Sequence, residues 1–184
     1  MDNGASSYRR FLDGDDQGLY ELICMYQHGL ILYINSYVQN VHTAECLAED
    51  TFAELAIKCP NYSGKCSFKT WLYSIARHIA IDYIRRETRI KTVSLEGYNT
   101  LEDENEIEDL FDKNEQKMVL HKAIKVLKPE YQQVLYLVFF EGFSNSDVAH
   151  IMKKSTRQIE NLIYNSKKAL KNQLERDGFN YEDI

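Results

Sequence analysis

Apolar residues recur at helical spacing through the first half of the chain. Between residues 19 and 38 they recur at intervals of three, one, three and four positions, the spacing of a helix that buries one stripe. A second amphipathic helix is predicted from Thr43, whose hydroxyl can cap it, to Cys59. Its acidic residues alternate with the inward-facing apolar ones, so both segments predict helices packed on a common core.

Residues 67–86 predict a third helix with an apolar side and a basic side. It follows a short polar connection over residues 60–66, and Ser67 can cap its start. Phe68, Trp71 and Tyr83 stand at helical spacing, which predicts that they are core residues. Its basic residues include Lys69, Arg77, Arg85 and Arg86. We expect Asp82 to form an intrahelical ion pair with Arg85 or Arg86.

The second half predicts four further helices. They cover residues 115–127, 129–142, 144–152 and a final segment that begins at Thr156. Pro129 suits a first helical turn, Gly142 predicts a stop, and Ser144 with Asp147 predicts a capping box. The last two helices, separated by a short polar turn, predict a helix-turn-helix.

The scarcity of chain breakers supports an all-α fold. The 184 residues contain two prolines and eight glycines, which favours long helices over short strands joined by turns. We predict two small helical domains, residues 1–91 and 115–184, joined by an acidic flexible linker over residues 92–114.

Charge is distributed in blocks. The formal net charge of -6 by itself argues against a polyanionic partner. Counted by segment, however, residues 1–57 carry -7, residues 58–91 carry +6, residues 92–115 carry -8 and residues 153–171 carry +5. Two basic segments therefore flank an acidic one, and each is a candidate surface for nucleic acid.

Signatures of other functions are missing from the sequence. The phosphate-binding, nucleophile-elbow, zinc-protease and dinucleotide motifs do not occur, so we predict neither a catalytic residue nor a cofactor. Cys24 with His28, and His42 with Cys46, make a zinc site conceivable, but closed zinc sites normally have tighter Cys spacings and simple packing is the favoured interpretation. With no signal peptide, no apolar run of membrane length and no C-x-x-C pair, the sequence predicts a cytoplasmic protein without a membrane segment.

The predicted helix-turn-helix carries residues suited to DNA. Outward residues near the start of its second helix can reach base edges, where Arg pairs with guanine and Asn or Gln with adenine. These are Arg157, Gln158 and Asn161. The preceding turn would meet phosphates through Lys153, Lys154, Ser155 and Thr156.

Three segments resemble one family in the expected order. Residues 67–86 resemble the promoter-melting helix of bacterial RNA polymerase sigma factors of the compact, extracytoplasmic-function type, with the sequence SFKTWLYSIARHIAIDYIRR. Residues 44–56 resemble the preceding helix of that family, which docks on the clamp helices of the β′ subunit, with the sequence AECLAEDTFAELA. Residues 127–174 resemble its C-terminal domain, which reads the upstream promoter element and touches the β flap.

The resemblance implies an alternative sigma factor that binds core RNA polymerase, recognises the -10 and -35 promoter elements and initiates transcription without catalytic activity of its own. It implies clamp binding through Glu45, Glu49, Asp50 and Glu54. It implies -10 binding and melting through Asn61, Tyr62, Ser63, Lys65, Lys69, Arg77, His78 and Arg85. Tyr62 is the better candidate for stacking on a flipped base, because it stands in the loop. The other implied partners are promoter DNA and an anti-sigma factor.

Some positions depart from the family pattern. Lys153 stands in the turn where Gly is usual, and Glu160, Leu162 and Asn165 stand where many members have Lys or Arg. Cys46 and Glu49 replace a frequent Asp and Gln, and His78 replaces a frequent Asn. Two alternatives therefore stay open: a sigma-like interaction protein that no longer reads promoters, and a helix-turn-helix regulator that uses only the C-terminal unit.

Overall fold

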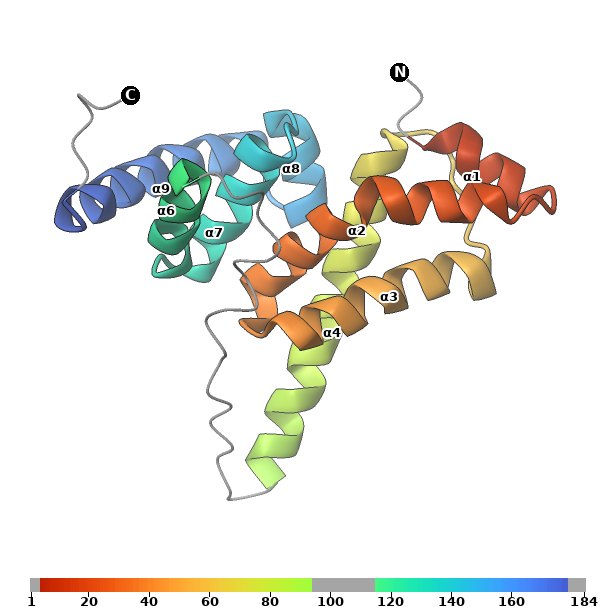
Figure 1. Ribbon diagram of the computed structural model, residues 1–184, viewed down its shortest axis with the longest axis horizontal. Coiled ribbons are helices and arrows are strands. Elements are labelled where there is room, and N and C mark those ends of the chain that lie inside the picture. Colours follow the sequence, from red (N-terminus) through yellow and green to blue (C-terminus); the bar gives the residue numbers. More distant parts are fainter. Residues whose placement is uncertain (1–3, 94–114, 179–184) are drawn as a thin grey trace.

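The computed structural model describes residues 4–93 and 115–178, and every regular element in these ranges is a helix (Figure 1). The first half consists of α1 (Ala5–Leu12), α2 (Gln17–Val38), α3 (Val41–Lys58) and α4 (Phe68–Val93). The second half consists of α6 (Glu115–Lys125), α7 (Pro129–Leu135), the π-helical turn η1 (Tyr136–Phe140), α8 (Asn145–Met152) and α9 (Thr156–Arg176). The predicted all-helical class is confirmed for these residues. The predicted linker lies outside them, apart from residues 92 and 93, which continue α4.

The first half is built on a hairpin of two long helices. α2 and α3 pack side by side, α4 crosses both, and α1 lies along the beginning of α2 (Figure 1). The sequence reasoning did not predict α1, a short helix whose inward side consists of buried Ser7 and Tyr8, with Ala5 and Phe11 partly buried against the core. Its close approach depends on Gly18, where a Cβ atom would lie 2.2 Å from the carbonyl oxygen of Ser7.

Side-chain caps set where α3 and α4 begin. The Oδ1 atom of Asn40 accepts a hydrogen bond of 2.8 Å from the backbone N–H of Thr43. The prediction that Thr43 caps this helix is therefore wrong, because the chain turns earlier, at Gln39, where φ is 56°. Ser67 does cap α4, since its Oγ accepts a bond of 3.1 Å from the N–H of Thr70.

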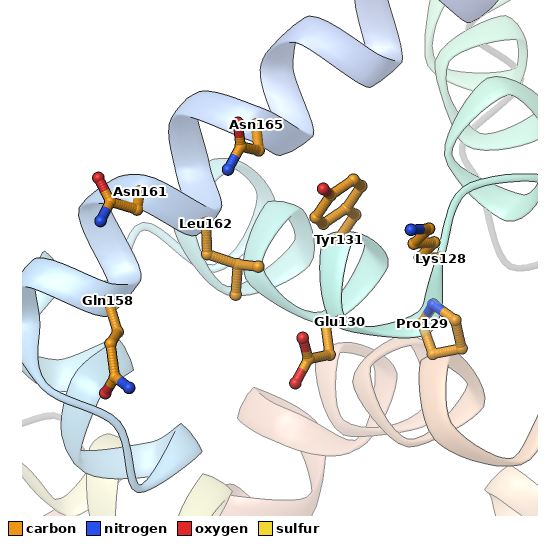
Figure 2. A pocket seen from close by; sticks show the side chains of 8 residues that line it. All are labelled: Lys128, Pro129, Glu130, Tyr131, Gln158, Asn161, Leu162 and Asn165. Atoms are coloured by element: carbon orange, nitrogen blue, oxygen red, sulfur yellow. The ribbon is translucent and has the colours of Figure 1, made fainter.

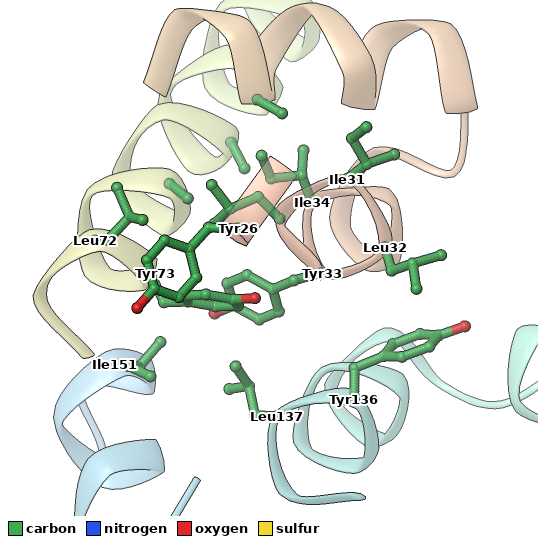
Figure 3. Packing of buried hydrophobic residues seen from close by; sticks show 14 of the residues in the cluster. Tyr26, Ile31, Leu32, Tyr33, Ile34, Leu72, Tyr73, Tyr136, Leu137 and Ile151 are labelled. Atoms are coloured by element: carbon green, nitrogen blue, oxygen red, sulfur yellow. The ribbon is translucent and has the colours of Figure 1, made fainter. Parts of the chain in front are cut away.

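The helix predicted over residues 129–142 is an α-helix in its first half and a π-helical turn in its second half. After α7 the backbone widens into η1, where the N–H of Glu141 bonds the carbonyl of Tyr136 five residues earlier. Two bulky residues at the start of this turn pack against different parts of the molecule. Tyr136 packs toward His121 of α6, and Leu137 packs toward the first half of the chain (Figure 3). Such π-turns are rare and localised, so the apolar pattern alone predicted an ordinary helix.

α8 and α9 form the predicted helix-turn-helix. Ala149 and Ile159 are buried where the two helices meet, and Leu162 is half-buried against the same core. Lys153 ends α8 in the left-handed conformation with φ of 54°, at the position where Gly was expected to be usual. Ser144 caps α8 as predicted, but the Asp147 carboxylate accepts hydrogen bonds from the hydroxyls of Ser144 and of Thr70 in α4.

One apolar core runs through both halves of the molecule. Buried Tyr33 and Tyr73 of the first half face Leu137 and Ile151 of the second (Figure 3). α8 packs on α4, and α7 packs on α2. The two predicted units are therefore in direct contact and share buried apolar surface.

No helix among the described residues is both long enough and apolar enough to span a bilayer.

Candidate nucleic-acid interface

The loop between α3 and α4 presents a small polar surface. Asn61, Ser63 and Lys65 are exposed there. Tyr62, the residue expected to stack on a base, is half-buried and packs against Phe68 and Trp71, with ring centroids 5.5 and 5.3 Å apart. Its hydroxyl donates a hydrogen bond of 2.5 Å to the carbonyl of Cys66. In this arrangement Tyr62 holds the loop in shape while its neighbours face solvent.

Tyr8 anchors the start of the same loop. Its hydroxyl donates a hydrogen bond of 2.8 Å to the carbonyl oxygen of Pro60. Burial, with the nearby Cys59 thiol adding to it, raises the pKa of Tyr8 to about 12. The hydroxyl therefore stays protonated near neutral pH and remains a hydrogen-bond donor. Through this bond α1 holds the start of the exposed loop in place.

The four basic residues expected along α4 divide into two groups. His78 and Arg85 are largely exposed and lie 3.2 and 3.4 Å from the Asp82 carboxylate, which confirms the predicted pairing of Asp82 with Arg85. Arg77 is half-buried beside Tyr33 and Tyr37 of α2, whose hydroxyls lie 2.9 Å apart. Lys69 is paired with Glu141 of the second half. Two of the four, His78 and Arg85, are thus exposed to solvent and can face an external phosphate while they lie beside Asp82.

The acidic residues of α3 lie on two sides of its exposed surface. Asp50 and Glu54 line a groove of about 370 Å³ toward α4, opposite His78 and Arg86. Glu45 and Glu49 lie outside that groove, and Glu45 is 3.5 Å from His42. Ile57 lies in the groove with 81% of its surface exposed. The sequence reasoning missed Ile57. The available signal was that this apolar residue lies outside the buried stripe of α3, where an exposed side chain is expected.

The helix-turn-helix presents most of its predicted DNA-contacting residues to solvent. Lys153, Thr156, Arg157 and Asn161 are all exposed. Lys154 is half-buried and lies 3.1 Å from Glu130. These side chains could contact a DNA backbone and base edges from the start of α9.

Ser155 and Gln158 are joined in a complete capping box. The N–H of Gln158 donates to Ser155 Oγ at 3.2 Å, and the N–H of Ser155 donates to Gln158 Oε1 at 2.8 Å. Both residues were predicted as DNA contacts from their position alone. Their hydrogen bonds also give them a structural role, since they define the first turn of α9.

A groove of about 490 Å³ lies between the start of α7 and α9 (Figure 2). Gln158, Asn161, Leu162 and Asn165 line it from α9. Leu162 is half-buried there, which explains an apolar residue where many family members were expected to have a basic one. Glu160 is exposed, so it does add a negative charge to the face of α9.

The conceivable zinc ligands are not brought together. No group of three or more such side chains could hold a metal ion within residues 4–93 and 115–178. Cys24 lies early in α2, whereas His42 and Cys46 lie early in α3, and the two helices are joined as a hairpin. In such a hairpin the start of α2 lies beside the end of α3. Cys24 and Cys46 are therefore at opposite ends of the helix pair.

Comparisons with known proteins match both halves of the chain. The family model for sigma-70 region 2 matches residues 22–90, and the model for sigma-70 region 4 matches residues 117–170. Similar proteins include the ECF RNA polymerase sigma factor SigM of Bacillus subtilis, 26% identical over 151 residues that cover 82% of this chain and 91% of that one. The ECF RNA polymerase sigma-E factor of Salmonella typhimurium is 22% identical over 175 residues, covering 90% of this chain and 91% of that one.

Solved structures share the fold. The sigma factor RpoE of Bartonella quintana, in complex with the anti-sigma factor NepR, superposes with a TM-score of 0.66 at 18% identity, covering 85% of this chain and 96% of that one. CnrH, in complex with the cytosolic domain of CnrY, superposes with a TM-score of 0.63 at 16% identity, covering 95% of this chain and 96% of that one. With region 2 and region 4 matched in order on one helical chain, this protein belongs to the ECF-type sigma-70 family, non-catalytic factors that recognise promoters and initiate transcription by RNA polymerase.

Proposed function

We propose that this sigma factor binds core RNA polymerase through α3, contacts the -10 element through residues 60–67 and α4, and contacts the -35 element through α9. The observation that carries the proposal is that an exposed polar loop beside a basic helix and an exposed helix-turn-helix stand on one chain. These are the two kinds of surface that separate single-stranded and double-stranded DNA elements require.

The polymerase contact rests on the groove between α3 and α4. Asp50 and Glu54 supply negative charge at its edge, and Ile57 supplies an exposed apolar group. An apolar centre with charged neighbours is a common composition for a protein interface. The proposed site on polymerase is the β′ clamp helices, with Glu45 and Glu49 extending the contact along α3.

The -10 contact rests on the loop side chains and the exposed part of α4. Asn61, Ser63 and Lys65 can hydrogen-bond bases that leave the stack, while His78 and Arg85 can approach phosphates. Lys69 and Arg77 are turned inward here, so they would join such a contact only after rearrangement.

The -35 contact rests on the start of α9. Arg157 and Asn161 are exposed and suited to base edges, and Lys153 and Thr156 are placed to meet phosphates. The β flap would contact other parts of the same half. We further propose that the factor works in the cytoplasm, and that an anti-sigma factor is a partner, as it is for the Bartonella quintana protein.

The experiment is transcription in vitro with core polymerase and genomic fragments. Specific transcripts that require this protein are expected. Core binding without transcripts would favour a degenerate, sigma-like interaction protein, and DNA binding without core binding would favour an ordinary helix-turn-helix regulator. Either result would contradict the proposed function.

Charge reversal at Asp50 tests the clamp surface. Asp50→Lys in the full chain should weaken core binding about tenfold, because it removes an exposed negative charge from the proposed contact and adds a positive one. Asp13→Lys makes the same change at an exposed position between α1 and α2 and should leave affinity unaltered. Equal affinities for the two variants, measured by titration of labelled core polymerase, would show that the contact lies elsewhere.

A further inference from the structure

A thiol and an imidazole from distant parts of the chain lie next to each other at the end of the loop between α3 and α4. The Sγ atom of Cys66 is 3.9 Å from Nε2 of His150, although the two residues are 84 positions apart in the sequence. Cys66 directly precedes Ser67, the cap of α4, and His150 lies in the last turn of α8. We refer to Cys66 and His150 as the thiol–imidazole pair.

Both members of the pair can be reached from solvent. His150 is exposed and Cys66 is half-buried. Cys59, at the opposite end of the same loop, is exposed as well, but its thiol bonds the carbonyl oxygen of Ala56 at 3.4 Å. The loop therefore offers two cysteines in different surroundings, and Cys66 is the one that faces a second metal-binding group.

Backbone contacts hold the two side chains of the pair in place. The hydroxyl of Tyr62 donates a hydrogen bond of 2.5 Å to the carbonyl oxygen of Cys66. On the other side, the N–H of Lys153 donates a hydrogen bond of 3.3 Å to the carbonyl oxygen of His150 at the end of α8. Ligands that are already fixed in position lose little conformational freedom when they bind a metal ion.

The separation of the two ligand atoms fits a shared metal ion. Bonds of about 2.3 Å to sulfur and about 2.0 Å to nitrogen place the two atoms about 3.5 Å apart at a tetrahedral angle and about 4.3 Å apart on a straight line. The observed 3.9 Å lies between these two values. Small rotations of the side chains would therefore suffice for a linear arrangement.

The number of ligands decides which metal the pair suits. The Asp147 carboxylate lies near the pair but accepts hydrogen bonds from the hydroxyls of Ser144 and Thr70. Across the two described ranges, 4–93 and 115–178, no set of three ligand side chains converges on one point. A structural zinc site needs four ligands. Soft thiolate ligands select Cu(I), an ion that two ligands in a line can hold.

The protonation state of Cys66 also favours a metal over redox chemistry. Burial, with the Asp147 carboxylate adding to it, raises the pKa of the Cys66 thiol. A thiol that keeps its proton is a poor nucleophile toward oxidants. A metal ion displaces that proton: the S–H bond breaks, an S–Cu bond forms, His150 donates a nitrogen lone pair, and H⁺ leaves to solvent. The product has no net charge, which suits a half-buried position.

We propose that Cys66 and His150 form a two-coordinate binding site for Cu(I). This inference goes beyond the proposed function and is independent of it, because neither DNA nor polymerase takes part in the binding. Two ligands held together should bind the ion about 100-fold more tightly than a single thiol. The bound ion would link the end of the loop to α8.

The main test compares the Cu(I) affinity of two full-length variants that each retain one cysteine. The first retains Cys66 and carries Cys24→Ser, Cys46→Ser and Cys59→Ser, three changes at exposed positions. The control retains Cys59 instead and carries Cys66→Ser. Anaerobic competition with the coloured Cu(I) chelator bathocuproine disulfonate should give one ion per chain and about 100-fold tighter binding for the variant that retains Cys66.

His150→Gln in the variant that retains Cys66 tests the second ligand. It should reduce the affinity to that of the control that retains Cys59. Before this substitution, X-ray absorption spectroscopy should find one sulfur and one nitrogen ligand on the bound Cu(I). Circular dichroism of the metal-free variants should report equal helix content, so that a loss of affinity is not a loss of folding.

Three results would overturn the inference. Equal Cu(I) affinities of the variants that retain Cys66 and Cys59 would show that the pair is only a weak S–H···N hydrogen bond. Unchanged affinity in His150→Gln would show that the imidazole is not a ligand. Two sulfur ligands on each Cu(I), with a doubled mass in gel filtration, would show that the thiols of two chains share the ion.

Discussion

Charged side chains of α4 differ in what they can bind because burial differs along the helix. His78 and Arg85 are exposed, whereas Arg77 lies beside two tyrosines of α2 and Lys69 is held by Glu141. A formal charge is available to DNA only when its side chain can reach solvent without abandoning a buried partner. The basic side of α4 is therefore smaller in this structure than the count of its basic residues indicates.

His121 is a buried ionisable residue away from the proposed DNA surfaces. Its Nδ1 atom lies 2.5 Å from the hydroxyl of Tyr136. Burial, with Lys125 as a smaller contribution, lowers the pKa of His121 to about 4 from its ordinary value of 6.5. The unfolded chain consequently binds a proton more readily than the folded one between about pH 4 and 6.5, so stability falls as the pH falls through this range.

Protonation of His121 should lower the free energy of unfolding by about 2 kcal/mol between pH 7 and pH 5. Above pH 7 the contribution of His121 to this free energy should be nearly constant. Urea denaturation at both pH values measures the drop. His121→Leu combined with Tyr136→Phe removes both polar partners and should reduce the drop by about that amount. An equal drop in the wild type and the double variant would disprove the assignment.

Helix ends carry much of the local specificity at the scale of single elements. Asn40, Ser67, Ser144 and Ser155 each accept a backbone hydrogen bond at the start of a helix. Such bonds satisfy N–H groups that have no partner within the helix. The bond at Ser155 also fixes the angle at which the chain enters α9, and hence the direction in which Arg157 and Asn161 face.

Ser155 was predicted as a phosphate contact and is also the cap of α9, and the two roles can be separated. Ser155→Ala should lower the free energy of unfolding by about 1 kcal/mol, because the cap is lost. Ser155→Asp retains a capping group and should keep that stability, while its negative charge should weaken binding to promoter DNA by polymerase loaded with this factor. Urea denaturation and filter binding measure the two effects. Equal loss of stability in both variants would show that the hydroxyl has another role.

At the scale of the whole molecule, both halves share one apolar core. Tyr33 and Tyr73 belong to region 2, and Leu137 and Ile151 belong to region 4, yet all four are buried near one another (Figure 3). Burial of the Tyr73 hydroxyl, with the nearby Glu141 carboxylate adding to it, raises its pKa well above the ordinary value. The interface is thus a packed interior in its own right.

Cooperative unfolding of the two halves follows from this shared core. Leu137→Ala should lower the free energy of unfolding by about 3 kcal/mol, because it removes a fully buried side chain and leaves a cavity. Hydrogen exchange followed by mass spectrometry should accelerate both in α4 and in α8. Val126→Ala, at an exposed position in the second half, is the matched control and should alter neither. Faster exchange in α8 with unchanged exchange in α4 would mean that the halves unfold independently.

Predictions from the sequence were best for features that depend on neighbouring residues. The 3.6-residue period predicted α2, α3, α4, α8 and α9, and the spacing of Ala149 and Ile159 predicted their burial in the helix-turn-helix. Prediction failed where the local pattern was weak. The short helix α1, which has little apolar surface, was not predicted, and the cap of α3 was assigned to Thr43 although it is Asn40. Tyr62 stays a candidate for base stacking, but nothing local to the loop showed that it would pack against Phe68 and Trp71.

The sequence by itself determined the family, the helical class and the order of the two halves, because helix periodicity and motif spacing are local properties of the chain. Tertiary structure alone decided that Lys69 meets Glu141, that Thr70 meets Asp147 and that Gly29 admits this contact. Lys69 and Glu141 are 72 positions apart. No pattern of charge or hydrophobicity along the chain specifies such a pair, since it depends on how whole helices pack.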